Sequence, residues 1–356
     1  MHIIISLILG VLVAWAFRKR DKPDPLGLWR VGACVLAAVV PHLDQLFYII
    51  SPGAGLMYQY TFMWSALLAP LFAFVIAQGF SYLSGGMQPE SKRTWQRFFM
   101  PVFAVFVFSI LLAVLSENGV AVLAPLWFGR VSFSIIHSFD VGLLMGLVVF
   151  TLLALMTGKW KTDVARIVLV LLIAYVGLVG TFKIKAHSVG TRYGEAMGLE
   201  VQRVYTLPQP LSPFYWRVIV LTEDGRLHDT LISLKRANPM ATTPDMNTIQ
   251  RAKAAYMPVH AAIWRIYNRY GLEKPELVKE AWHSDISQSL GWPSRFAVFQ
   301  RMSTYSGMPC AQFKDLRFEG LKAEHLGVYL LCRSEEGWQA YQAADDDLFF
   351  RLDAIY

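Results

Sequence analysis

The sequence predicts a polytopic α-helical membrane bundle of about six spans, followed by a soluble α+β domain. Long apolar stretches fill the first half of the chain, basic residues gather in alternate loops, and the chain becomes polar after Phe182. With 55% hydrophobic residues and a mean hydropathy of +0.39, the 356-residue chain is more apolar than ordinary soluble domains. We therefore expect a membrane domain over residues 1–182 and a folded periplasmic domain over residues 183–356.

The apolar stretches approach or reach the length of about 20 residues that a helix needs to cross hydrocarbon. They cover residues 3–17, 31–50, 62–83, 98–115, 139–156 and 167–182. The first is the shortest, so a cleaved signal peptide is an alternative. A signal peptide carries its basic residues before the apolar part, whereas here they follow it. We therefore expect a retained first helix.

Basic residues in alternate loops predict the orientation. They follow the first stretch (Arg18, Lys19, Arg20, Lys22), the third (Lys92, Arg93, Arg97) and the fifth (Lys159, Lys161, Arg166). Loops rich in Lys and Arg remain in the cytoplasm. The loop 51–59 is uncharged and the loop 117–137 carries one Arg and one Glu. The N-terminus and residues 183–356 are therefore predicted outside, as in a bacterial inner-membrane protein.

The net charge of +7 indicates membrane topology and contact with anionic lipids. The Lys and Arg residues form no stripe, so a nucleic-acid partner is not expected. The oligomeric state does not follow from the sequence.

The C-terminal half carries strand and turn signals. Residues 214–221 and 227–234 flank a Gly-containing turn, which is typical of a β-hairpin. Residues 247–270 have helical spacing after a capping Asn247. Three further strands are expected at 296–304, 310–318 and 327–333, completing one small antiparallel sheet.

Three cysteines are present, and Cys34 lies in a predicted span. Cys310 and Cys332 fall in neighbouring predicted strands on the predicted outer side. They could form a disulfide, as in oxidising compartments, or be two small buried hydrophobic residues.

Four ionisable residues near the outer ends of the spans are candidate metal ligands: His42, Asp44, His137 and Asp140. Charged groups in hydrocarbon need partners and often mark functional sites. His137 and Asp140 are three residues apart and would share a helical face. His42 and Asp44 could both point inward only if Pro41 distorts the helix. The alternative is a hydrogen-bonded cluster that holds the bundle together.

Other polar and aromatic residues near the same ends suggest a cleft for lipid or substrate: Tyr58, Gln59, Trp64, Ser65, Glu117 and Arg130. The aromatic residues also fit an ordinary interfacial belt. Ser65 lacks the Gly-x-Ser-x-Gly context of a nucleophile, so a hydrogen bond at a helix start is the favoured role.

The succession of these motifs resembles the YdjM-like family of membrane-bound, predicted metal-dependent hydrolases. Pro41-His-Leu-Asp44 stands where the family has Pro-Asp-x-Asp, and residues 59–65 stand where it has His-Arg-Gly-x-Thr-His-Ser. Ser6 occupies the position of an opening His. Ser109 and Ala113 replace a His and an Asp four apart, and Asp140 keeps the final acid. The resemblance extends over nearly the whole chain.

The resemblance implies a hydrolytic metal site, with a divalent ion such as zinc and with Asp44 and Asp140 as catalytic acids. Such a site needs at least three protein ligands. Gln59, Trp64 and Ala113 replace expected ligands and are poor or impossible ones. We therefore expect no cofactor in a catalytically impaired protein that binds lipid or a partner. An active lipid hydrolase with a rewired site and a structural subunit of an envelope complex remain alternatives.

Overall fold

The computed structural model describes residues 2–18, 24–85, 94–271, 275–289, 295–319, 327–343 and 349–352. Five of the basic loop residues fall outside these ranges: Lys19, Arg20, Lys22, Lys92 and Arg93. The chain divides into two compact units. Unit 1 contains Met1–Asp44, Tyr60–Lys185 and Leu207–Trp216, and unit 2 contains Gln45–Gln59, Ala186–Thr206 and Arg217–Tyr356.

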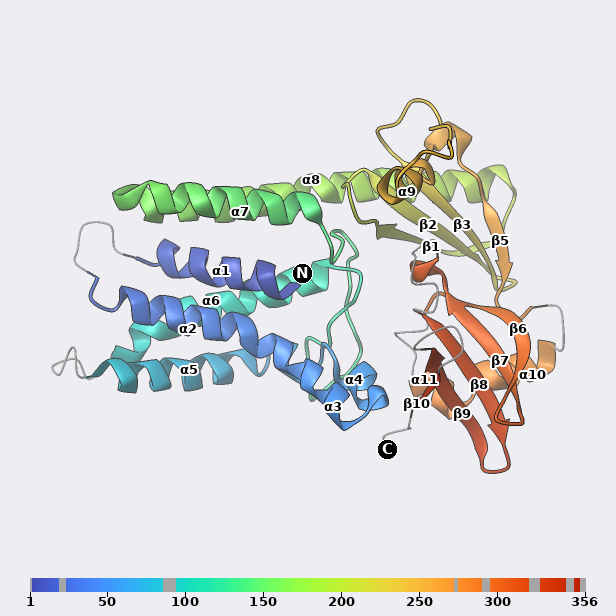
Figure 1. The fold of residues 1–356 in the computed structure, drawn as a ribbon, viewed down its shortest axis with the longest axis horizontal. Coiled ribbons are helices and arrows are strands. Elements are labelled where there is room, and N and C mark those ends of the chain that lie inside the picture. The colour runs from blue at the N-terminus through green and yellow to red at the C-terminus, as the bar shows by residue number, and fades with distance from the viewer. Residues whose placement is uncertain are drawn as a thin grey trace. The chain divides into compact units, whose positions relative to one another are not determined.

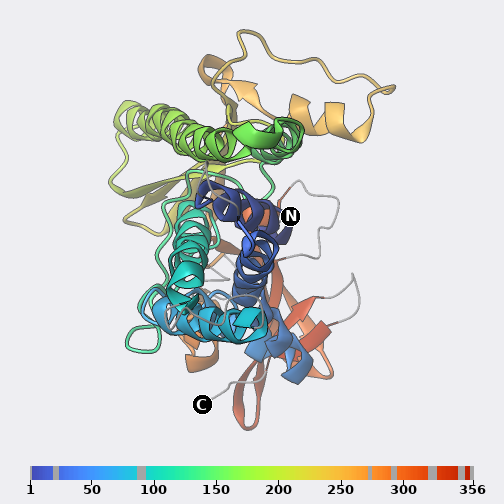
Figure 2. The same cartoon turned by 90° about the vertical axis from the view of Figure 1, so that its left-hand side faces the viewer.

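Unit 1 is a bundle of apolar helices (Figure 1). They are α1 (His2–Ala16), α2 (Gly27–Val39), α5 (Ala69–Ser84), α6 (Thr94–Leu115), α7 (Val141–Met156) and the first part of α8 (Lys161–Ala196). Figure 2 views α1, α2, α5 and α6 nearly end-on. Helix α1 packs against α2, α6 and α7, and α5 packs against α2 and α6.

Small residues let these helices approach closely, as is usual in membrane bundles. The buried positions of α2 are Ala33, Cys34, Ala37 and Ala38. A Cβ at Gly10 of α1 would lie 2.7 Å from the Cys34 carbonyl oxygen. Glycine is therefore required at this contact between α1 and α2.

Among the residues that the structure describes, three helices are long and apolar enough to cross a membrane: Gly27–Ile50, Trp95–Leu115 and Lys161–Ala196. A fourth crossing results if Gly53–Trp64 and Ala69–Ser84, which meet at 70°, form one bent span. Helices α1 and α7 are apolar but shorter. The prediction of an apolar helical N-terminal region is confirmed, and the count of six spans stays a prediction.

The second predicted stretch is distorted at Pro41, as expected. The 3-10 helix η1 (Val40–Leu46) separates α2 from α3 (Phe47–Ile50). Proline lacks the amide hydrogen of a regular helix and clashes with the preceding turn. His42 and Asp44 are both buried, with exposed fractions of 8% and 2%.

The third predicted stretch, 62–83, is broken, so the prediction of one continuous helix was wrong. Helix α4 (Pro52–Tyr58) and the 3-10 turn η2 (Phe62–Trp64) precede α5, which begins at Ala69. A proline in the first turn of α5 favours a helix start at this point.

Basic side chains gather around the C-terminal end of α1. Arg30 Nε donates a hydrogen bond to the Ala14 carbonyl oxygen at 2.9 Å, and Arg166 Nε donates to that of Ala16 at 3.0 Å. The Lys161 ammonium lies 3.9 Å from the centre of the Trp15 ring. The last carbonyl groups of a helix need such donors and attract positive charge.

The described part of the C-terminal half forms two five-stranded sheets, so the expectation of one sheet was wrong. The first has the order β1 (Val201–Pro208), β2 (Tyr215–Thr222), β3 (Arg226–Ser233), β4 (Met257–Pro258), and β5 (Arg265–Asn268) also pairs with β3. The second has the order β10 (Phe349–Leu352), β9 (Gly337–Ala343), β8 (Val328–Ser334), β7 (Met308–Asp315), β6 (Ala297–Tyr305). The predicted hairpin and the three predicted strands are confirmed.

The predicted helix 247–270 is mostly wrong. Helix α9 (Thr248–Ala254) begins with the predicted Asn247 cap, which forms a capping box with Gln250. Pro258 lies where the helix would continue, and the chain turns into β4 and β5 instead.

Helices also cover the second sheet. Helix α10 (Pro275–Trp282) contacts β8, and α11 (Asp285–Ser289) contacts β9. Helix α4, which comes from the loop predicted between two spans, contacts β10. Leu56 of α4 packs against the buried core of this sheet.

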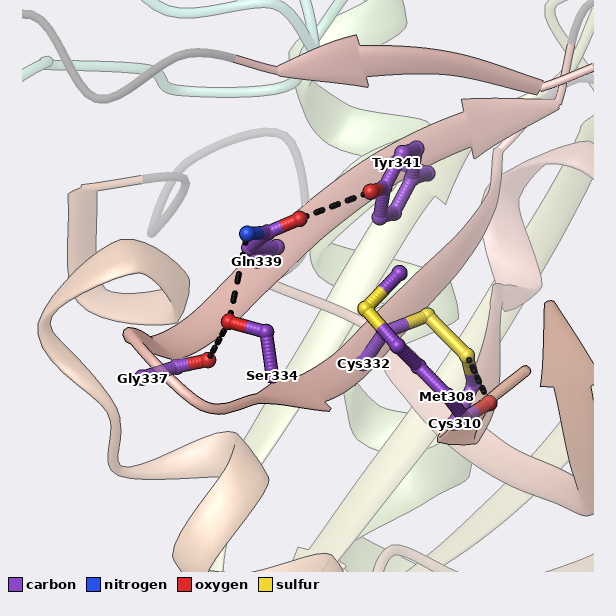
Figure 3. Close-up of a disulfide and its surroundings, with 7 residues drawn as sticks. All are labelled: Met308, Cys310, Cys332, Ser334, Gly337, Gln339 and Tyr341. Atoms are coloured by element: carbon purple, nitrogen blue, oxygen red, sulfur yellow. Dashed lines mark hydrogen bonds between the residues drawn. A yellow bond between two sulfur atoms is a disulfide. The ribbon is translucent and has the colours of Figure 1, made fainter. Parts of the chain in front are cut away.

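Cys310 and Cys332 form a disulfide that joins β7 to β8 (Figure 3). The two residues are direct partners in the strand pairing. The sequence left open whether these cysteines form a disulfide or are two small buried hydrophobic residues, and the structure has the disulfide. A disulfide is consistent with an extracytoplasmic sheet domain.

Replacing both Cys310 and Cys332 by Ser should lower the unfolding free energy of unit 2. The loop between the two cysteines spans 22 positions, and closing a loop of this size stabilises a fold by about 3 kcal/mol. The measurement is thermal unfolding of the full chain in detergent. Dithiothreitol should lower the stability of the wild type and leave that of the double variant unchanged. An effect of dithiothreitol on the double variant would contradict this prediction.

Candidate functional site

The candidate site of unit 1 begins at the Pro41 distortion. His42 Nε2 lies 3.2 Å from Ser6 Oγ, and the His42 ring meets Trp64 edge-on at 5.2 Å between centroids. The Asp44 carboxylate accepts a hydrogen bond from the Tyr60 amide. The 3-10 turn thus directs two ionisable side chains of η1 toward residues of other segments.

The contacts continue from Tyr60 into the segment that follows α6. Asn118 Nδ2 donates to the Tyr60 hydroxyl oxygen at 3.2 Å and to Ser138 Oγ at 2.9 Å. The Ser138 amide donates to both carboxylate oxygens of Glu117, at 3.1 and 3.0 Å. His137 Nε2 lies 3.6 Å from Glu117 Oε1. A connected polar network therefore joins three predicted residues, Asp44, Glu117 and His137, through Tyr60, Asn118 and Ser138.

Asp140 belongs to a separate pair of hydrogen bonds. It is the N-cap of α7, where Oδ1 accepts from the Leu143 amide at 2.9 Å and Oδ2 accepts from the Tyr175 hydroxyl at 2.7 Å. Since α7 begins at Val141, His137 and Asp140 precede the helix and do not share a helical face. The expected pairing of these two residues was based on the wrong helix start.

The four candidate metal ligands are engaged in different contacts. Within the part of the chain that the structure describes, no three His, Cys, Asp or Glu residues are grouped so as to hold a metal ion. His42 contacts Ser6, Asp44 contacts Tyr60, His137 contacts Glu117, and Asp140 contacts Tyr175. This arrangement ties segments of the bundle together, and the metal site stays a prediction.

The predicted cleft residues divide between the two units. Tyr58 and Gln59 belong to unit 2, where Tyr58 packs against Phe47 and Gln59 accepts a hydrogen bond from Tyr48 at 3.2 Å. Trp64, Ser65, Glu117 and Arg130 belong to unit 1. Trp64 is 2% exposed, and Arg130 is partly buried.

Ser65 has the structural role that the sequence favoured. Its hydroxyl donates to the Ala124 carbonyl oxygen at 2.5 Å and accepts from the Leu67 amide at 3.1 Å. Its own carbonyl oxygen accepts from the Ala69 amide, the first of α5. Ser65 therefore fixes the turn into α5 and connects it to the segment after α6.

Unit 2 contains a buried ionic cluster that the sequence analysis missed. Arg217 Nε of β2 lies 3.4 Å from Asp229 Oδ1 of β3, and both side chains are at most 3% exposed. Arg217 also donates to the Glu319 carbonyl oxygen at 3.1 Å. The Glu319 carboxylate accepts from Arg265 at 3.2 Å and from the Tyr267 hydroxyl at 2.9 Å.

Burial changes the titration of this cluster. It raises the pKa of Asp229 to about 6, which the positive charge of Arg217 only partly opposes. Burial and the neighbouring Glu319 carboxylate raise the pKa of Tyr267 to about 12. Part of the signal was present in the sequence, because Arg217 stands between the apolar residues Trp216 and Val218, whereas Asp229 has the polar neighbours His228 and Thr230.

No family model, curated protein or solved structure matches this chain.

Replacing Asp140 by Ala should destabilise unit 1 by about 2 kcal/mol, because a helix cap and a side-chain hydrogen bond are both lost. Asp140→Asn keeps an acceptor for the Leu143 amide and should cost clearly less. Equilibrium unfolding in mild detergent, followed by circular dichroism, measures both. Equal losses in the two variants would contradict the capping role.

The stability of unit 2 should fall as the pH rises from about 4 to about 7. The folded-state pKa of Asp229 is raised from 3.8 to about 6. The protonated Asp229 carboxyl therefore contributes fully to stability below about pH 4. This contribution is lost as the pH rises past about 6, which lowers the unfolding free energy by about 2 kcal/mol. Thermal unfolding of the full chain across this range measures the slope.

Asp229→Asn is the control for this pH dependence. The amide imitates the protonated carboxyl, so the variant should be closest to the wild type in stability at about pH 4, where Asp229 is neutral as well. Its stability should change less between about pH 4 and about pH 7 than that of the wild type. The same slope in both proteins would assign the pH dependence to another group.

Proposed function

We propose that this chain is a bacterial inner-membrane protein of the YdjM-like metal-dependent hydrolase family, catalytically impaired, that binds lipid or a protein partner. Six helices cross the membrane in this proposal, with α1 and α7 as short spans. The sheets of unit 2 are periplasmic, which agrees with the Cys310–Cys332 disulfide.

The hydrogen bonds of the two retained acids carry the proposal. Asp44 accepts from the Tyr60 amide, and Asp140 caps α7 and accepts from Tyr175. A family member that loses its metal chemistry also loses the selection on its imidazole ligands. Asp44 and Asp140 would still be kept, because each carboxylate holds helices and connecting segments together.

The contact between Ser6 and His42 supports the kinship. These two residues stand where the family pattern has an opening His and the first Asp of Pro-Asp-x-Asp. The two positions lie within hydrogen-bond distance here, at 3.2 Å. In an ancestor with an intact site, two side chains that bound the same metal ion would lie similarly close. The Ser6–His42 pair is therefore compatible with a metal site that has been lost.

Binding of lipid is favoured by the environment of the network. Trp64 is buried among Ala and Phe residues of the bundle core, and its indole Nε1 has no hydrogen-bond partner among the described residues. Buried indole donors usually have an acceptor. A carbonyl or phosphate oxygen of a lipid would supply one if the bundle opens locally to admit it, because Trp64 itself is only 2% exposed.

Metal content and bound lipid should be measured together on detergent-purified protein. We expect no near-stoichiometric transition metal by elemental analysis, either in the wild type or in the Asp44→Asn, Asp140→Asn double variant. Native mass spectrometry should detect retained lipid or a retained polypeptide. Near-stoichiometric metal in the wild type that is lost in the double variant would instead support an active hydrolase.

Tyr175→Phe is the matched control for the double variant. It removes one hydrogen bond of Asp140 and leaves both carboxylates in place. A real metal site should therefore survive in it, whereas a loss caused by loosening of α7 and α8 should appear in both variants. A polypeptide that co-purifies in fixed ratio with all three proteins, without retained lipid, would favour a structural subunit.

A further inference from the structure

The segment after α6 presents large apolar side chains on its surface. Leu123 is 45% exposed, Leu126 84%, and Trp127 and Phe128 50% each. We call these four residues the apolar loop. Between Glu117 and Arg130 the sequence has no ionisable residue. Exposed apolar surface of this kind marks a contact with a membrane or a partner.

The base of the apolar loop is fixed by hydrogen bonds. Val120 and Val131 exchange a pair of backbone hydrogen bonds at 3.0 and 2.9 Å. The Ala66 amide donates to the Val122 carbonyl oxygen at 2.9 Å, and Ser65 Oγ donates to that of Ala124. Ala121 and Ala124 are fully buried. The structure thus holds the apolar side chains outward.

Packing within the loop sets the position of its aromatic rings. A Cβ at Gly129 would lie 2.0 Å from the Trp127 ring, so the indole lies directly against the backbone. The Phe128 ring meets Phe62 edge-on at 5.6 Å. Both rings therefore have defined positions while half of each remains exposed.

We propose that the apolar loop inserts into the lipid bilayer at the end of the bundle where α5 begins and α6 ends. The loop is hydrogen-bonded to the start of α5, whose own apolar side chains are exposed: Leu71 is 56% and Val75 60% exposed. The loop thus continues a surface that faces lipid.

The residue types also fit lipid better than a protein partner. Trp prefers the depth of the membrane interface, Leu and Phe suit the apolar side of an interfacial segment, and Arg130 follows where headgroup phosphates would lie. A protein interface usually has a rim of polar residues around its apolar centre, which this uncharged loop does not supply. The inference needs the membrane location of the bundle but not the binding role of the polar network.

A single introduced cysteine tests the insertion. Among the described residues Cys34 is the free cysteine and is buried, and Cys310 and Cys332 are bridged, so a surface cysteine can be labelled selectively. The Leu126→Cys variant of the full chain is labelled with an environment-sensitive fluorophore. It is then reconstituted in phosphatidylcholine nanodiscs, with or without spin-labelled lipid. Leu126 is mostly exposed, so this change leaves the core intact.

Two matched positions calibrate the signal. Val75→Cys on α5 reports the lipid-facing surface, and Ala237→Cys, an exposed residue after β3, reports water. We expect the Leu126 probe to show blue-shifted emission, strong quenching by spin-labelled lipid and weak quenching by iodide, as at Val75. A probe that behaves as at Ala237 would overturn the proposal. Shielding from both quenchers would overturn it as well, and would indicate a protein surface covering the loop.

Discussion

The bond between the Asp44 carboxylate and the Tyr60 amide is the contact on which the arrangement of unit 1 depends. A buried carboxylate in an apolar bundle is costly unless donors surround it, and here a backbone amide from the next helical segment is one. The bond ties the end of the Pro41 distortion to the segment before η2. From Tyr60, contacts to Trp64 and Asn118 extend the connection to the segment after α6. Together with the contact between His42 and Trp64, that first bond joins the broken ends of two helices.

The sequence predicted those features that one residue or one local pattern determines. Pro41 predicted the distortion of its helix, Asn247 predicted the start of α9, and the turn before Arg226 predicted the hairpin. Features that depend on distant segments were not predictable in the same way. The spacing of His137 and Asp140 indicated a shared face, but Asp140 is bonded to Tyr175, 35 residues away. The pairing of Cys310 with Cys332 depends on strand register, which spacing alone left open.

The missed strands have a common physical reason. Strand β9 carries glutamines and glycine among its apolar residues, and β1 begins with three positions that stay largely outside the core. Neither shows the clear alternation of a half-buried strand. The division into two sheets was not predictable either. The sequence pattern identifies a hairpin, but it does not show which other strands the hairpin pairs with. Of the candidate site, the sequence predicted His42, Asp44, Glu117 and His137, while the roles of Asn118 and Ser138 follow only from the contacts.

The packing of α4 against β10 has a consequence for biosynthesis. Leu56 emerges from the ribosome long before Phe349–Leu352, the strand that it helps to cover. The second sheet therefore cannot reach its complete packing during translation, however early its central hairpins form. Contacts between such distant positions slow folding and leave apolar surface exposed in the meantime. A nascent chain of this protein would spend most of its synthesis with α4 uncovered, a state in which a chaperone could recognise it.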